Sequence, residues 1–149
     1  THGFRLGGAM ILNIDSADAS GRTFRQRYDL RSPYLFTIGY EVTKEVRSGS
    51  WLNLVFVGNA SISGLNQNKV LPSINGLIGF EFEDSFQLGV GSQLTLEKDG
   101  EDKTVPSARM IMAAGWTPSV GSFETPVHVT VVPDPEGAHR VGLTVGVNW

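Results

Sequence analysis

The last nine residues, 141–149, constrain the fold of this chain more than any other stretch. Alternate residues in this stretch are apolar, the alternation continues to the final residue, and that residue is aromatic. Alternate residues of an extended strand share one face, and the apolar face here consists of Val141, Leu143, Val145, Val147 and Trp149. Ends of soluble domains usually fray into water, whereas a strand that closes a membrane barrel turns its apolar face to lipid. The terminal stretch therefore favours a membrane barrel.

The same alternation recurs along the whole chain, and almost no segment has helical spacing. Seven further runs with a period of two precede the terminal one: 4–14, 34–43, 52–63, 73–83, 86–96, 107–116 and 127–131. Such runs predict strands, and an even number of strands is typical of single-chain outer-membrane barrels. Residues 1–149 are therefore predicted to form a single all-β domain, an eight-stranded antiparallel up-and-down transmembrane β-barrel.

The connections between these runs alternate in character. The longer polar connections are 15–32, 64–70, 98–104 and 133–139, and the shorter connections are 47–50, 84–85 and 117–122. Outer-membrane barrels have long loops at the outer rim and short turns at the periplasmic rim. We therefore expect both termini to be periplasmic. The abrupt start at Thr1 also leads us to expect that this is the barrel part of a longer protein.

The alternation by itself leaves open which face of the barrel is inside, because a soluble lipocalin-type barrel turns its apolar face inward. The interior of eight strands is just wide enough for side chains or one small ligand, so the bulky apolar face fits better outside. Aromatic residues near the strand ends are placed as membrane-interface girdles would be. The predicted interface aromatics are Tyr34, Tyr40, Trp51, Trp116 and Trp149.

On these features the chain resembles the small eight-stranded bacterial outer-membrane barrels of the outer membrane protein A, OmpX and OmpW type. The resemblance is architectural, covers the whole length, and has one motif, the terminal strand with its aromatic last residue. It implies location in the outer membrane of a Gram-negative bacterium, contact with lipid and lipopolysaccharide, and insertion by the barrel-insertion machinery, which recognises the terminal strand. Phe is the usual last residue of that group, so Trp149 is a departure that keeps the aromatic character.

Several ionisable residues fall on the predicted inward face. They are Arg5, Glu41, Glu81, Glu83, Arg109 and His128. Buried charges must be paired, and both signs are present. The pattern therefore predicts a luminal charge network that plugs the barrel, with a gated polar channel or a proton-linked site as the alternative.

Composition excludes some functions and leaves others without support. The formal net charge is −3 and there is no cysteine, which argues against a nucleic-acid partner and excludes disulfides and thiolate sites. We expect no metal and no cofactor: the loop acids Asp99, Glu101, Asp102, Asp134 and Glu136 are interpreted as solvated rather than as calcium ligands.

No catalytic residues are predicted either. Some barrels of the resembling group hydrolyse or acylate lipids, but no serine, histidine and acid can be assembled into a catalytic set here. We therefore expect no enzymatic activity. A loop cluster of arginines is instead a candidate for contact with acidic lipopolysaccharide; its members are Arg22, Arg25, Arg27 and Arg31.

The resulting hypothesis is an outer-membrane structural anchor or scaffold. It would display extracellular loops or hold a protein partner in the cell envelope, with its lumen plugged by side chains. One alternative is a porin-like narrow pore or transporter for small solutes. A second alternative is a soluble barrel that binds a small apolar ligand.

Overall fold

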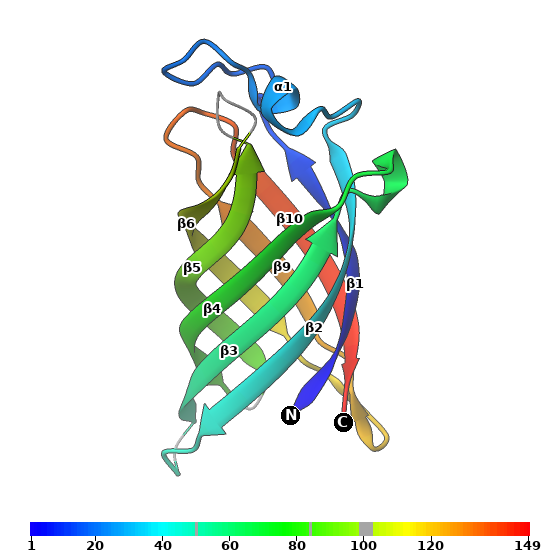
Figure 1. Ribbon diagram of the computed structural model, residues 1–149. Helices are drawn as coiled ribbons and strands as arrows, with labels where there is room; N and C mark the ends of the chain where they lie inside the picture. Colours follow the sequence, from blue (N-terminus) through cyan, green and yellow to red (C-terminus); the bar gives the residue numbers. More distant parts are fainter. Residues whose placement is uncertain (50, 84, 99–102) are drawn as a thin grey trace.

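The computed structural model of the chain describes all residues except 50, 84 and 99–102. Eight strands of six to thirteen residues form a closed barrel (Figure 1), in which each strand pairs antiparallel with the next and the last pairs with the first. They are β1 (His2–Ile11), β2 (Tyr34–Val46), β3 (Leu52–Ser63), β4 (Leu71–Phe82), β5 (Phe86–Lys98), β6 (Thr104–Trp116), β9 (Val127–Val132) and β10 (Arg140–Asn148). The predicted eight-stranded antiparallel up-and-down β-barrel is confirmed.

The connections predicted to be long and those predicted to be short lie at opposite ends of the barrel (Figure 1). Both chain termini lie at the end with the short connections, here called the lower rim, and the opposite end is the upper rim. A small hairpin of β7 (Ser119–Val120) and β8 (Phe123–Glu124) extends from the lower rim. The predicted alternation of connection lengths is observed only in part, because the lower connection 117–126 contains this hairpin and is longer than the upper connections 64–70 and 133–139. Residues 50, 84 and 99–102 of the predicted connections lie outside the described residues.

The long connection between β1 and β2 folds over the upper rim. It contains the short helix α1 (Phe24–Tyr28), and the connection between β3 and β4 contains the 3₁₀ turn η1 (Leu65–Gln67). A capping box starts α1, since the Thr23 hydroxyl accepts a hydrogen bond from the Gln26 backbone N–H and the Gln26 side chain accepts one from the Thr23 N–H.

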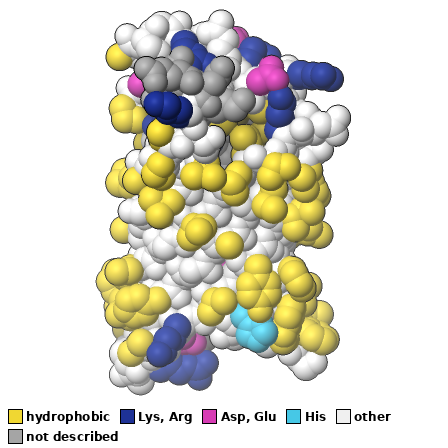
Figure 2. Space-filling view, viewed as in Figure 1, with side chains coloured by type: hydrophobic (Ala, Val, Ile, Leu, Met, Phe, Trp, Pro, Cys, Tyr) yellow, Lys and Arg dark blue, Asp and Glu magenta, His cyan; other side chains and the backbone are white. Residues whose placement is uncertain are grey.

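The outward face of the barrel is apolar. Figure 2 shows patches of apolar side chains on the wall between the rims, with charged side chains gathered near the two ends. Outward residues lie directly opposite each other on neighbouring strands, as Leu6, Ile38 and Ile62 do. On the terminal strand, Leu143, Val145, Val147 and Trp149 are exposed and Val141 is half-buried.

Buried apolar residues form two clusters. The upper cluster joins the β1–β2 connection to the barrel and consists of Ile11, Ile14, Phe24, Tyr28, Leu30, Leu35 and Ala138. The luminal cluster consists of Leu77, Ile111 and Val132, with Val57 and Ala113 packed against it. No helix in the described part of the chain is long and apolar enough to cross a membrane.

Candidate functional site: the barrel lumen

Five of the six predicted luminal residues lie inside the barrel, and one does not. Arg5, Glu41 and Glu81 are buried, and the side chains of Arg109 and His128 are nearly so. Glu83 is a correction: it is exposed and lies in the turn after β4, with a φ of 50°. The prediction was wrong because the alternation in the sequence continues to Glu83, whereas β4 ends at Phe82.

A charge cluster, the lower network, crosses the lumen. An Arg5 guanidinium N–H donates to Glu41 Oε1 at 2.5 Å, and His128 Nδ1 lies 3.6 Å from Glu41 Oε2. Arg5 and Glu41 are on the adjacent strands β1 and β2, whereas His128 is on β9, two strands away from β1 around the barrel. The three side chains therefore span the interior rather than follow one wall.

Two glycines make room for this network. A Cβ on Gly146 would lie 2.5 Å from an Arg5 guanidinium nitrogen, and a Cβ on Gly115 would lie 2.4 Å from His128 Cδ2. Only residues without a side chain fit beside these two groups. The small residues of the inward face are thus matched to the large ionisable ones.

A second ion pair lies at the upper end of the lumen. Arg109 lies 3.3 Å from Asp134, whose side chain is almost fully buried in the connection after β9. The prediction that Asp134 is solvated was wrong, because Asp134 is buried and pairs with Arg109. Glu136 remains one-third exposed and lies 3.1 Å from an Arg27 guanidinium nitrogen. The buried partners of both acids lie far away in sequence, where no local pattern indicates them.

Two of the four loop arginines, Arg25 and Arg27, form ion pairs within the protein. Arg27 is buried, its guanidinium lies over the Phe24 ring, and it pairs with Glu136 and Asp18. Arg27 is therefore not at the surface, and contact of the other loop arginines with lipopolysaccharide stays a prediction. Arg25 pairs with Asp15 at 2.9 Å and donates to the Arg31 carbonyl, so these residues hold the β1–β2 connection together.

A ladder of polar side chains, the polar row, connects the lower network to the upper ion pair. Its members lie directly opposite one another on adjacent strands β2 to β6 and are Glu41, Asn59, Asn75, Gln93 and Arg109. The Asn75 amide donates to Asn59 Oδ1 at 3.2 Å. Because barrel strands are tilted and staggered, residues paired directly across successive strands lie at successively different heights along the barrel axis. The polar row therefore rises from the lower half of the lumen to the upper rim.

A row of hydroxyls, the hydroxyl row, lies one inward position above the polar row. It consists of Ser61, Ser73 and Thr95, each directly opposite the next. Ser61 Oγ and Ser73 Oγ are 2.8 Å apart and share a hydrogen bond. The sequence placed these residues on inward faces, but their alignment across strands depends on registers that the period of two leaves undetermined.

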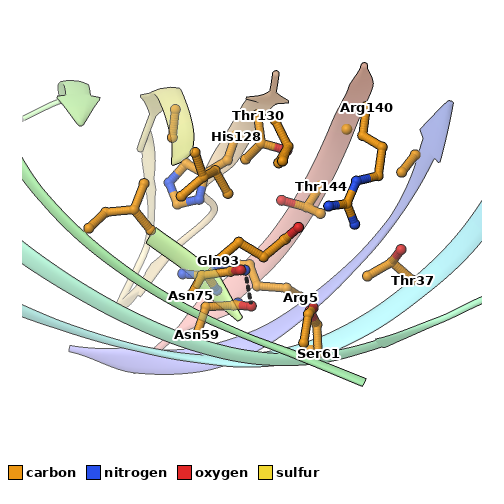
Figure 3. A pocket seen from close by; sticks show the side chains of 18 of the residues that line it. Arg5, Thr37, Asn59, Ser61, Asn75, Gln93, His128, Thr130, Arg140 and Thr144 are labelled. Atoms are coloured by element: carbon orange, nitrogen blue, oxygen red, sulfur yellow. Dashed lines mark hydrogen bonds between the residues drawn. The ribbon is translucent and has the colours of Figure 1, made fainter. Parts of the chain in front are cut away.

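The lumen encloses a cavity of about 150 Å³, here called the chamber. Arg5, Glu41 and His128 bound it below, and Phe24 and Tyr28 of α1 bound it above. Figure 3 shows the polar side chains in its wall, with the hydrogen bond between Asn75 and Asn59 dashed. A second cavity of about 220 Å³, the lower vestibule, opens below the lower network and shares Arg5, Glu41 and His128 with the chamber.

The predicted interface aromatics are all exposed, but four of the five lie toward the lower rim. Trp149 packs edge-on against His2, and Trp51 stacks on Phe82. Trp116 lies opposite Phe86 at the lower ends of β6 and β5. Tyr40 belongs to the same group although it is mid-strand, because β2 extends beyond β1 and brings its hydroxyl to His2.

Tyr34 is the exception and lies at the upper end of β2. The aromatic belt formed by these five residues is therefore strongly one-sided.

Among the described residues, no group of three or more histidines and acids is arranged to hold a metal ion. Asp99, Glu101 and Asp102, which the sequence analysis considered for calcium, lie outside the described residues. No family model matches the chain, and no curated protein matches it.

Proposed function

We propose that this protein is a closed β-barrel of the bacterial outer membrane that serves as a structural anchor. It would display its upper connections outside the cell and hold a partner of the envelope. The observation that supports this most directly is the apolar outward face: residues such as Ile78 and Leu143 are more than half exposed in the inner part of their strands. In water such a surface would be a large aggregation liability, whereas lipid accepts it.

Backbone pairing supports the same proposal. The pairing of β1 with β10 closes the sheet, as a sheet placed in hydrocarbon requires, although only Met112–Trp116 of β6 pair with β9. In the proposed orientation the lower rim, with both termini and the short turns, faces the periplasm. The terminal strand would then be the segment that the barrel-insertion machinery recognises.

The side chains inside the barrel favour an anchor over an open pore. The lower network crosses the lumen, and α1 lies over its upper end. Breaking a buried ion pair by losing one partner is unfavourable, so the network resists opening. No solute is assigned, and no catalytic role is proposed.

The membrane location is tested by purifying the protein in detergent and comparing heated with unheated samples on a gel. A closed detergent-resistant barrel migrates at a different apparent size until it is boiled. Equal migration, together with a monomeric protein in detergent-free buffer, would support a soluble barrel instead.

A narrow pore is the second candidate, because the chamber and the lower vestibule meet at shared lining residues, which are Arg5, Glu41, Gln87 and His128. Conductance in planar bilayers distinguishes the two. An anchor gives negligible conductance for both the native protein and Glu41→Gln, which weakens both contacts of that carboxylate. Single-channel steps that grow in Glu41→Gln would establish the pore.

A further inference from the structure

We infer that the chamber is a binding site for a small uncharged molecule that combines a hydrogen-bond donor with an apolar body of about one aromatic ring. This goes beyond anchoring and concerns only the lumen, so it holds whether the barrel lies in lipid or in water. Three observations carry it: unpartnered acceptors, an apolar wall beside them, and the lack of an available charge in the chamber.

The first observation is a group of buried acceptors without donors. Asn75 Oδ1, Gln93 Oε1 and Thr95 Oγ1 have no hydrogen-bond partner among the described residues. Gln93 and Thr95 are only 9% and 8% exposed, and all three residues line the chamber. Donors nearby are already used: the Asn75 amide donates to Asn59, and the Ser61 and Ser73 hydroxyls share a hydrogen bond with each other. Buried acceptors normally receive a hydrogen bond, so these three atoms require a hydroxyl or N–H donor from outside the chain.

The second observation is the apolar surface beside these acceptors. Leu77 and Ile111 lie two residues below Asn75 and Arg109 on the same strands, and Val57 lies two residues below Asn59. Together with Val132 they form the luminal cluster and line the chamber. A ligand with its donor at the polar row would therefore rest its apolar part on this cluster.

Size and charge limit the ligand further. A cavity of about 150 Å³ lined by apolar side chains holds a molecule such as benzene, and the chamber has this volume. Its charged lining residues are engaged: Arg5 with Glu41, and Arg140 over the Phe24 ring. A charged ligand would have to displace these contacts, whereas a phenol-like or alcohol-like molecule would not.

Phenol and anisole are suitable probes, because they have similar rings but only phenol has a donor. The folded protein in detergent micelles is titrated with each while nuclear magnetic resonance follows the Gln93 side-chain amide and the methyl groups of Ile111 and Val132. We expect saturable shifts at these groups and at least tenfold tighter binding of phenol than of anisole. No saturable shift at the luminal groups, as when water alone fills the chamber, would overturn the inference.

Two variants locate the site. Gln93→Leu keeps the volume but removes the acceptor, and it should lower phenol affinity to that of anisole. Ile111→Trp fills the chamber and should abolish binding of both, whereas Met110→Trp, an exposed neighbour on the same strand, should leave binding unchanged. Each variant is first checked for the heat-dependent gel shift of the native barrel. Phenol binding that survives in both luminal variants would place the ligand elsewhere and refute the inference.

Discussion

At the scale of single residues, Arg5 is the side chain whose loss has the clearest consequence. Its guanidinium is fully buried against Glu41 in the lower network. Arg5→Ala would leave that carboxylate buried with one partner fewer, and removal of one member of a buried pair destabilises a protein by about 3–5 kcal/mol. We expect a loss of this order in the free energy of unfolding, measured by urea titration of the refolded barrel.

Arg25→Ala is the matched control. Arg25 pairs with Asp15 at the surface, where ion pairs contribute about 0–1 kcal/mol. If Arg5→Ala and Arg25→Ala lower the free energy of unfolding by similarly small amounts, the lower network does not hold the lumen closed.

Asp18 provides a pH-dependent test in the β1–β2 connection. A hydrogen bond from the Ser20 hydroxyl, with further bonds from backbone N–H groups, lowers the pKa of Asp18. A lowered carboxyl pKa means that the ionised form stabilises the folded loop. This contribution is complete above the ordinary value of about 3.9 and is lost as the pH falls through the lower folded pKa.

We expect the nuclear magnetic resonance titration of the Asp18 carboxyl to have a midpoint below the ordinary value, and Ser20→Ala to raise that midpoint. An unchanged midpoint in Ser20→Ala would show that the hydroxyl does not act on the carboxylate.

Individual residues also show where sequence reasoning stops. The inward positions of Arg5, Glu41 and His128 followed from alternation, because each lies inside a strand. The prediction for Glu83 was wrong because alternation does not mark the end of a strand. The left-handed backbone conformation of Glu83 already belongs to the turn. The predicted solvation of Asp134 was wrong because its burial depends on Arg109, which is brought near it only by the pairing of β6 with β9.

At the scale of elements, β10 tests which face of the barrel meets lipid. Leu143 is exposed at the centre of the strand, opposite Gly8 on β1 and Val129 on β9. In the proposed membrane barrel, Leu143→Arg near the bilayer midplane should cost about 2–4 kcal/mol of folding free energy in lipid vesicles.

Val120→Arg, an equally exposed apolar position in the β7–β8 hairpin beyond the barrel wall, should have little effect. Small effects of both substitutions would mean that Leu143 faces water.

The strands could be predicted from the sequence, whereas the contents of the lumen could not. The number of barrel strands follows from local alternation and turn residues. The β7–β8 hairpin was not predicted, and it lengthens a connection that was expected to be short. The polar row requires the registers that bring Asn59, Asn75 and Gln93 into line, and these are long-range properties. The helix α1 was missed although a signal for it was present, because Thr23 and Gln26 have the spacing of a capping box.

At the scale of the whole molecule, the one-sided aromatic belt predicts how the barrel sits in a bilayer. All three tryptophans of the chain lie toward the lower rim. We expect their fluorescence to be quenched strongly by lipids brominated near the headgroup and weakly by lipids brominated at the chain ends. The opposite order would place the tryptophans at the bilayer centre and would contradict the proposed depth of the barrel.

The polar row also bears on how reliably the barrel assembles. A slip of one residue between two strands turns every side chain to the wrong face and is rejected by the apolar pattern. A slip of two residues keeps every face correct, so that pattern gives no protection against it. Such a slip would bring Asn75 opposite Val57 or Ser61 instead of Asn59 and would break their amide hydrogen bond. The interior side chains thus favour the native strand alignment over a slip of two residues, and the apolar exterior cannot make this distinction.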